Sequence, residues 1–133
     1  SGSSIAETIN RMANRIVVIE QTTKALMGSL AIGYWKCDAT GLCNEISKDM
    51  CWMLGRAENE LIGNNWIGLL DRTDKERIFN AWQFSIENNT TFNEEYTFIK
   101  TDGSKIKVNG VAYQLYDDQR NLIGFFGTIK KID

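Results

Sequence analysis

The chain of 133 residues contains no histidine. Without an imidazole, Ser-His-Asp and Cys-His catalysis, histidine-containing metal sites and histidine-ligated haem are excluded. Carboxylates are the remaining acid–base candidates, and two pairs are adjacent in sequence, Glu94-Glu95 and Asp117-Asp118. Neighbours on a strand point to opposite faces, so the first pair cannot form a catalytic dyad, and the second falls in a polar turn. We therefore expect this chain not to be an enzyme.

Phosphate-binding loops and metal-binding cysteine motifs are also missing. Neither G-x-G-x-x-G nor G-x-x-x-x-G-K-[ST] occurs in the sequence. Cys37, Cys43 and Cys51 are too few for a closed zinc site and show no C-x-x-C spacing. Their odd number argues against a disulfide framework and favours a reducing compartment. We expect no metal and a cytoplasmic location.

Long apolar runs and basic clusters are scarce. The stretch IVVI at 16–19 is far too short to cross a bilayer, and no signal-peptide pattern is present. The net charge is −2, and no basic run is longer than Lys130-Lys131. We expect no direct membrane contact and no nucleic-acid partner, although the parent protein could be membrane-anchored.

The residues that are present fit one globular domain. Hydrophobic residues make up 43% and charged residues 24%, and four Trp, four Tyr and six Phe can fill an interior. We interpret 1–4 (SGSS) as an added tail, 5–28 as an amphipathic or coiled-coil helix, and 29–133 as the folded domain.

The helix at 5–28 carries apolar residues at alternating spacings of four and three, with one polar member. The members of this seam are Ile5, Ile9, Met12, Ile16, Ile19, Thr23 and Leu26. Such a seam is typical of two-helix contacts. It predicts a homodimer through Ile5, Ile9, Met12, Ile16, Ile19 and Leu26; alternatively, the seam lies on the outer face of the domain's own sheet.

The rest of the chain predicts strands and helices in separate runs. The expected strands are 31–38, 42–46, 92–100, 105–116 and 122–132. Ser47 is expected to cap a short helix that Gly55 ends, and Thr73 to open a capping box for a helix to about Glu87. The apolar phase of 105–116 slips around Gly110, which predicts a bulge there. Segregated strands and helices indicate an α+β domain with an antiparallel sheet and helices across one face.

Several short motifs, taken in order, resemble the PAS (Per-Arnt-Sim) family. They are G-x-W-x-x-D-x-x-G (Gly33, Trp35, Asp38, Gly41), Leu54-Gly55, ENELIGNNW (58–66), F-x-x-E-Y (Phe92, Glu95, Tyr96), Asp102-Gly103 and G-x-x-G-T (Gly124, Gly127, Thr128). The resemblance runs from about Ile32 to Ile132. Ser47 stands where the family often has Asn, and Lys131-Ile132-Asp133 replaces the family's D-I-T ending.

The resemblance implies a PAS fold with a five-stranded antiparallel sheet. It also implies a sensor or dimerisation module of a larger signalling protein, such as a two-component histidine kinase or a diguanylate cyclase. The partners implied are a second copy of the chain and a downstream effector domain.

The residues after Gly63 are similar to those of the flavin-binding light-oxygen-voltage type only in part. Asn65 and Leu69 match that type. Trp66 stands where the type has its adduct-forming cysteine, and Ile67 and Leu70 replace its arginine and glutamine. The resemblance therefore implies no flavin–cysteinyl chemistry, and with no histidine for haem we expect no cofactor.

Any pocket of this domain would be lined by side chains around the middle helices. Our candidates for its wall are Trp66, Trp82, Glu94, Tyr96, Phe98, Asn109 and Tyr113. Glu94 and Asn109 would orient a noncovalent, apolar or aromatic ligand. The alternative is that the aromatic residues simply fill the core. Two functions stay open: dimerisation with relay of packing changes, and small-molecule sensing.

Overall fold

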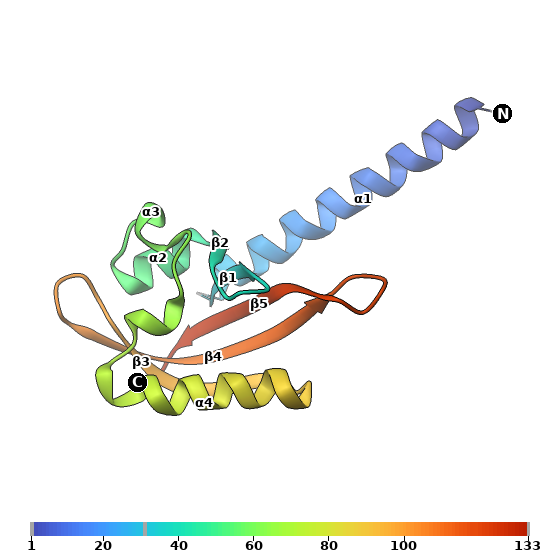
Figure 1. Ribbon diagram of the computed structural model, residues 1–133. Coiled ribbons are helices and arrows are strands. Elements are labelled where there is room, and N and C mark those ends of the chain that lie inside the picture. Colours follow the sequence, from blue (N-terminus) through green and yellow to red (C-terminus); the bar gives the residue numbers. More distant parts are fainter. Residues whose placement is uncertain (1, 31, 133) are drawn as a thin grey trace. The chain divides into compact units, whose positions relative to one another are not determined.

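The structure is a computed structural model that describes residues 2–30 and 32–132. It divides into two compact units, Ser1–Leu30 and Ala31–Asp133. The first unit is a single helix, α1 (Gly2–Ser29), which confirms the predicted N-terminal helix and extends it into the first residues (Figure 1). Within α1, the side chains of 2–3, 13–20, 24 and 27–29 lie outside the described residues.

The second unit contains a five-stranded antiparallel sheet in the order β2-β1-β5-β4-β3. The strands are β1 (Ile32–Asp38), β2 (Cys43–Ile46), β3 (Phe92–Ile99), β4 (Lys105–Tyr116) and β5 (Leu122–Lys131). Each pair of neighbours is antiparallel, and the first and last strands of the chain meet at the centre of the sheet. The predicted α+β class and five-stranded antiparallel sheet are confirmed.

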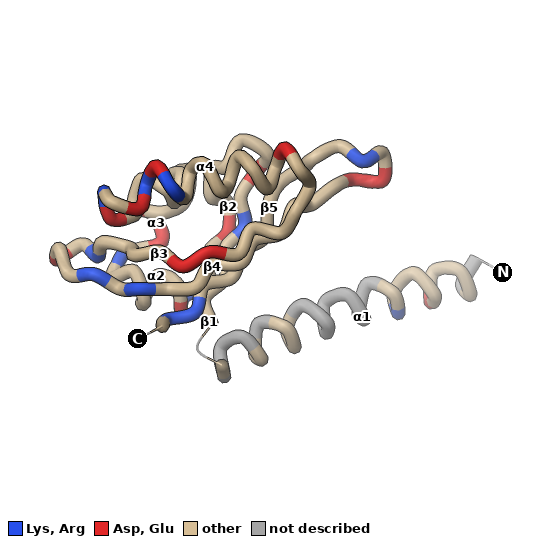
Figure 2. Tube along the Cα trace, turned by 90° about the horizontal axis from the view of Figure 1, so that it is seen from below, with Lys and Arg blue, Asp and Glu red and all other residues tan. Residues whose placement is uncertain are grey.

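The helices of this unit all lie between β2 and β3 in the sequence. They are α2 (Lys48–Leu54), α3 (Glu58–Leu61), the 3-10 helix η1 (Trp66–Leu69) and α4 (Arg72–Asn88). Ser47 caps α2 by accepting a hydrogen bond from the Met50 N–H, and Gly55 ends it at φ 61°, as predicted. Figure 2 shows α4 along one face of the sheet, with residues of both charges near its N-terminal end.

Two predicted details are wrong. Helix α4 begins at Arg72, and its cap is the carboxylate of Asp71, which accepts from the Thr73 N–H; the expected capping box at Thr73 does not open the helix. Strand β4 also pairs with β3 and β5 through Gly110 without a break, and its irregularity lies between Leu115 and Tyr116. The ring of Tyr96 occupies the space that a side chain at position 110 would take, which accounts for the glycine without a bulge.

Candidate functional site

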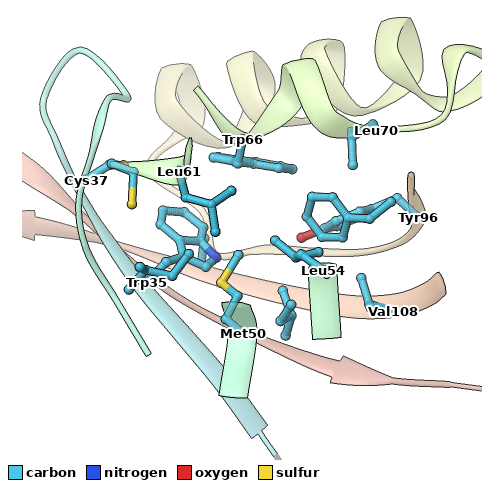
Figure 3. Close-up of a cluster of buried hydrophobic side chains, with 14 of the residues drawn as sticks. Trp35, Cys37, Met50, Leu54, Leu61, Trp66, Leu70, Tyr96 and Val108 are labelled. Carbon is cyan, nitrogen blue, oxygen red and sulfur yellow. The ribbon is translucent and has the colours of Figure 1, made fainter. Parts of the chain in front are cut away.

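Trp66 lies at the centre of the buried aromatic residues between helices and sheet. Its ring centroid is 5.3 Å from that of Tyr96, 5.4 Å from Trp82, and 5.8 Å from Trp35 and Phe92. Figure 3 shows Trp66 entering from the helical layer, whereas Trp35 comes from β1. Trp66 is only 6% exposed, so its indole fills space between the helices and the sheet.

The sequence around Trp66 explains its position. Gly63 has φ 83°, in the left-handed region that favours glycine, and its N–H donates to the Cys43 carbonyl at 2.7 Å. The Asn64 carbonyl accepts from the Cys43 N–H at 3.0 Å, so this loop is tied to β2. Asn65 then caps η1 by accepting from the Ile67 N–H at 2.9 Å. These bonds fix the backbone that directs the indole inward.

The space left beside Trp66 is small. A cavity of about 10 Å³ remains, and its wall includes Trp35, Cys43, Met50, Leu61 and Trp66. That volume is about the minimum for one water molecule, whereas ligand pockets measure roughly 300–1,000 Å³. In this structure the aromatic residues fill the core, and a noncovalent ligand would require them to move. Ligand binding stays a prediction.

Two glycines let aromatic rings lie directly on the sheet. A Cβ at Gly127 would overlap the indole of Trp35, and a Cβ at Gly110 would overlap the phenol of Tyr96. Because these positions carry no side chain, each ring packs against the backbone of a neighbouring strand. Trp35 and Tyr96 thereby cover the inner face of the sheet, and Trp66 packs against both rings from the helical layer.

The structure brings together only part of the predicted pocket wall. Trp66, Trp82, Tyr96 and Phe98 are buried in one cluster. Glu94 lies at its edge, where its carboxylate is 3.5 Å from the Arg77 guanidinium.

Asn109 and Tyr113 lie outside this cluster. The Asn109 amide donates to Asn93 at 3.0 Å, and the Tyr113 side chain is 51% exposed. The prediction placed Tyr113 inward because it assumed a bulge at Gly110. Without that bulge, Ala112 faces the core and Tyr113 the opposite side.

A polar groove beside the start of α4 was not predicted. The Arg77 guanidinium contacts Asp74 at 3.2 Å and donates to the Glu95 carbonyl at 2.8 Å. Asp74 in turn accepts from the Thr97 N–H at 2.9 Å. These contacts satisfy part of the exposed edge of β3. The spacing of Asp74 and Arg77 on one helix was visible in the sequence, but the strand that they reach was not.

The titratable groups of the core are held in their neutral forms. Burial raises the pKa of the Cys37 thiol from 9.0 to about 12, and it also raises the pKa of the Tyr96 phenol. Burial likewise raises the pKa of Cys43. Nucleophilic chemistry uses a thiolate, so these thiols are poorly reactive at neutral pH. Among the described residues, no group of three or more Cys, Asp or Glu is arranged to hold a metal ion.

The predicted dimerisation residues that the structure describes are exposed on α1. Ile5 is 64% exposed, Ile9 60%, and Met12 and Leu26 58% each. Ile16 and Ile19 lie outside the described side chains. None of the described helices has both the length and the apolar character needed to span a membrane.

Comparisons with known proteins agree with this geometry. A comparison with protein families matches residues 21–132 to the family described as PAS fold. A search of curated proteins found no match.

Among solved structures, the PAS domain of a protein from Colwellia psychrerythraea is 19% identical with a TM-score of 0.75, over 86% of this chain and 97% of that one. A sensory box histidine kinase/response regulator from Burkholderia thailandensis is 16% identical with a TM-score of 0.69, over 83% of each chain. The N-terminal domain of a diguanylate cyclase with PAS/PAC sensor from Marinobacter aquaeolei is 18% identical with a TM-score of 0.69, over 75% and 94%.

These likenesses concern the fold, and the family match covers the sheet, the helices and the aromatic core described above. The chain belongs to the PAS family.

Proposed function

We propose that this chain is a sensory or regulatory PAS module that dimerises through α1 and relays changes in packing to an effector domain of a signalling protein. The observation that carries the proposal is the exposed apolar seam of α1. Ile5, Ile9, Met12 and Leu26 each expose more than half of their side chain, at the spacing of a coiled coil. A second copy of the same helix would cover this seam.

The interior supports a role that does not depend on a bound cofactor. Trp66 contacts four other rings. A displacement of the helical layer would therefore change the packing of Trp35 on β1 and of Tyr96 on β3. Well-packed cores respond to such displacements by switching between arrangements, since they deform little continuously. The names of two similar structures join this fold to a histidine kinase and a diguanylate cyclase, which supports an effector of that kind.

Sedimentation tests the dimer. The chain with Ile9→Glu is expected to sediment as a monomer, because a carboxylate would be buried in the apolar seam. Gln21→Glu adds the same group at an exposed position of α1 outside the seam, and it is expected to leave the dimer intact. A chain that starts at Gly28 should be monomeric.

Two outcomes would contradict the proposal. A monomeric parent chain at micromolar concentration would remove the dimer altogether. Equal dimerisation of the Ile9→Glu and Gln21→Glu variants would place the interface away from the seam.

A further inference from the structure

Two of the three cysteines face each other across neighbouring strands. In the β1–β2 hairpin, Trp35 pairs with Ile46 and Lys36 with Glu45. The register then shifts between Lys36 and Cys37, so that Cys37 is opposite Cys43. Both cysteine side chains are buried, at 3% and 8% exposure, and both belong to the core. The irregularity in the hairpin therefore aligns two thiols on one face.

The backbone hydrogen bonds define the type of this pair. The Cys43 N–H donates to Asn64, and the Cys43 carbonyl accepts from Gly63, so both groups of Cys43 point away from β1. Cys37 and Cys43 are thus a non-hydrogen-bonded pair, for which the Cα atoms of antiparallel strands are about 4.5 Å apart. Disulfides require Cα separations of about 4.4–6.8 Å. A regular pair of this type would place its two Cα atoms within that range.

We propose that Cys37 and Cys43 are a modification site that takes a reversible cross-strand disulfide when a peroxide oxidises the protein. One thiolate attacks an oxygen of hydrogen peroxide, so that an S–O bond forms and the O–O bond breaks. The cysteine becomes a sulfenic acid, and the leaving hydroxide is protonated to water. The second thiol displaces the sulfenic oxygen as another water, and an S–S bond forms. The two thiols lose two protons and two electrons, and the peroxide takes up both and becomes two water molecules. A dithiol reductant reverses the reaction by thiol–disulfide exchange.

Burial controls when this site reacts. The Cys43 thiol donates to the Glu45 carbonyl at 3.5 Å, and both cysteines are shielded from solvent in the closed hairpin. Strand β2 has only four residues and lies at the edge of the sheet, so it can open locally more readily than the central strands. Oxidation is therefore slow and follows the opening of β2.

The disulfide would restrain the segment beside Trp66. Cys43 lines the small cavity next to the indole, and its backbone is bonded to Gly63 and Asn64. A bond to Cys37 would fix β2, and with it the loop that directs Trp66 inward. The oxidation state of the pair would thus set how freely the helical layer moves on the sheet.

Oxidation of the folded 133-residue chain with hydrogen peroxide, followed by alkylation and peptide mapping, tests the site. The expected result is a mass loss of two hydrogens, a decrease from three free thiols to one, and a single cross-linked peptide that joins Cys37 and Cys43. A dithiol should restore all three thiols. Cys51→Ser should give the same bond, because Cys51 lies on α2 and not on a paired strand.

The unfolded chain is the reference for the pairing. In urea, the three cysteines should give mixed pairs, whereas the folded chain should give one. Bonds to Cys51 in the folded chain, three free thiols after oxidation, or equal mixtures in the folded and the unfolded chain would each overturn the proposal. Because the native chain itself carries the readout, the result does not depend on a cysteine variant that folds poorly.

Discussion

Trp66 is the side chain on which the filled interior depends most. Replacing it with alanine removes an indole that contacts four rings and leaves a cavity among them. Large-to-small changes of this kind cost about 3–5 kcal/mol, and we expect that loss in the free energy of unfolding measured with urea. The change would also open an apolar cavity of the kind that binds benzene.

Trp52 provides the matched control for Trp66. Its side chain is 84% exposed on α2, so Trp52→Ala removes the same indole without opening the core. We expect its free energy of unfolding to stay within about 0.5 kcal/mol of the parent. Equal losses in the two variants would show that Trp66 does not pack as described.

Gly127 tests the second way in which the core is closed. In Gly127→Ala the new methyl group would collide with the indole of Trp35, which is 3% exposed and cannot move into solvent. Overpacking of this kind costs roughly 1–3 kcal/mol, measurable by urea unfolding. Gly68→Ala is the control, because a Cβ there meets no atom within 4 Å. A stability of Gly127→Ala equal to that of Gly68→Ala would refute the close ring–backbone packing.

The individual core residues show what the sequence can predict. Trp66 was recognised because its neighbours fix its register in the family pattern, but size alone does not decide burial, since Trp52 is 84% exposed and Trp66 only 6%. Tyr113 was misplaced because the face of a strand residue depends on every bulge before it. Whether Gly110 marks a bulge or makes room for a ring depends on Tyr96, which belongs to another strand. That information lies in the pairing of strands and not in the local pattern.

Helix α2 depends on a cap that also belongs to the sheet. The Ser47 hydroxyl accepts from the Met50 N–H at 3.2 Å and from the Tyr34 N–H at 2.9 Å, so it joins α2 to β1. Ser47→Ala would leave both donors without this partner, at 8% exposure of the residue. We expect a loss of about 1–2 kcal/mol in urea unfolding.

Thr73→Ala is the control for the cap of α2. Thr73 begins the sequence pattern of a capping box, but α4 is capped by Asp71 and Thr73 is exposed. Its hydroxyl should contribute little, and we expect a change within about 0.5 kcal/mol. If Thr73→Ala lowered the free energy of unfolding as much as Ser47→Ala, Thr73 would be the cap of α4, as the sequence pattern predicted. The sequence pattern alone could not decide between Asp71 and Thr73, because both residue types are good caps. The ion pair between Lys105 and the Asp71 carboxylate, at 2.9 Å, joins residues that are far apart in the sequence.

Two aspartates in turns, Asp38 and Asp117, make the stability of the molecule depend on pH in acid. A hydrogen bond from the Thr40 side chain holds the pKa of Asp38 below its usual value, and backbone and side-chain bonds from Asn121 do the same for Asp117. Because the folded-state pKa is below the unfolded one, the unfolded chain binds more protons as the pH falls. Stability is therefore present above the unfolded pKa near 3.8 and is lost as the pH falls through the folded pKa. Urea unfolding from pH 6 to pH 3 should show a decline that is shallower in Asp38→Asn, and an unchanged slope would contradict it.

The neutral and alkaline ranges should behave differently from those of most domains. No histidine titrates between about pH 5 and 8, so the free energy of unfolding should be nearly constant there. Above that range the raised pKa of Cys37 acts in the opposite sense to the aspartates: the thiol stays protonated when folded and ionises near 9.0 when unfolded. Its contribution is complete below pH 9.0 and is lost as the pH rises toward about 12. Urea unfolding from pH 7 to 10.5 should show this decline begin near pH 9, and it should be weaker in Cys37→Ala, whose lower starting stability is corrected by comparing slopes. Cys51→Ala, at a less buried thiol, is the matched control, and a slope that falls equally in both variants would show that Cys37 is not the group responsible.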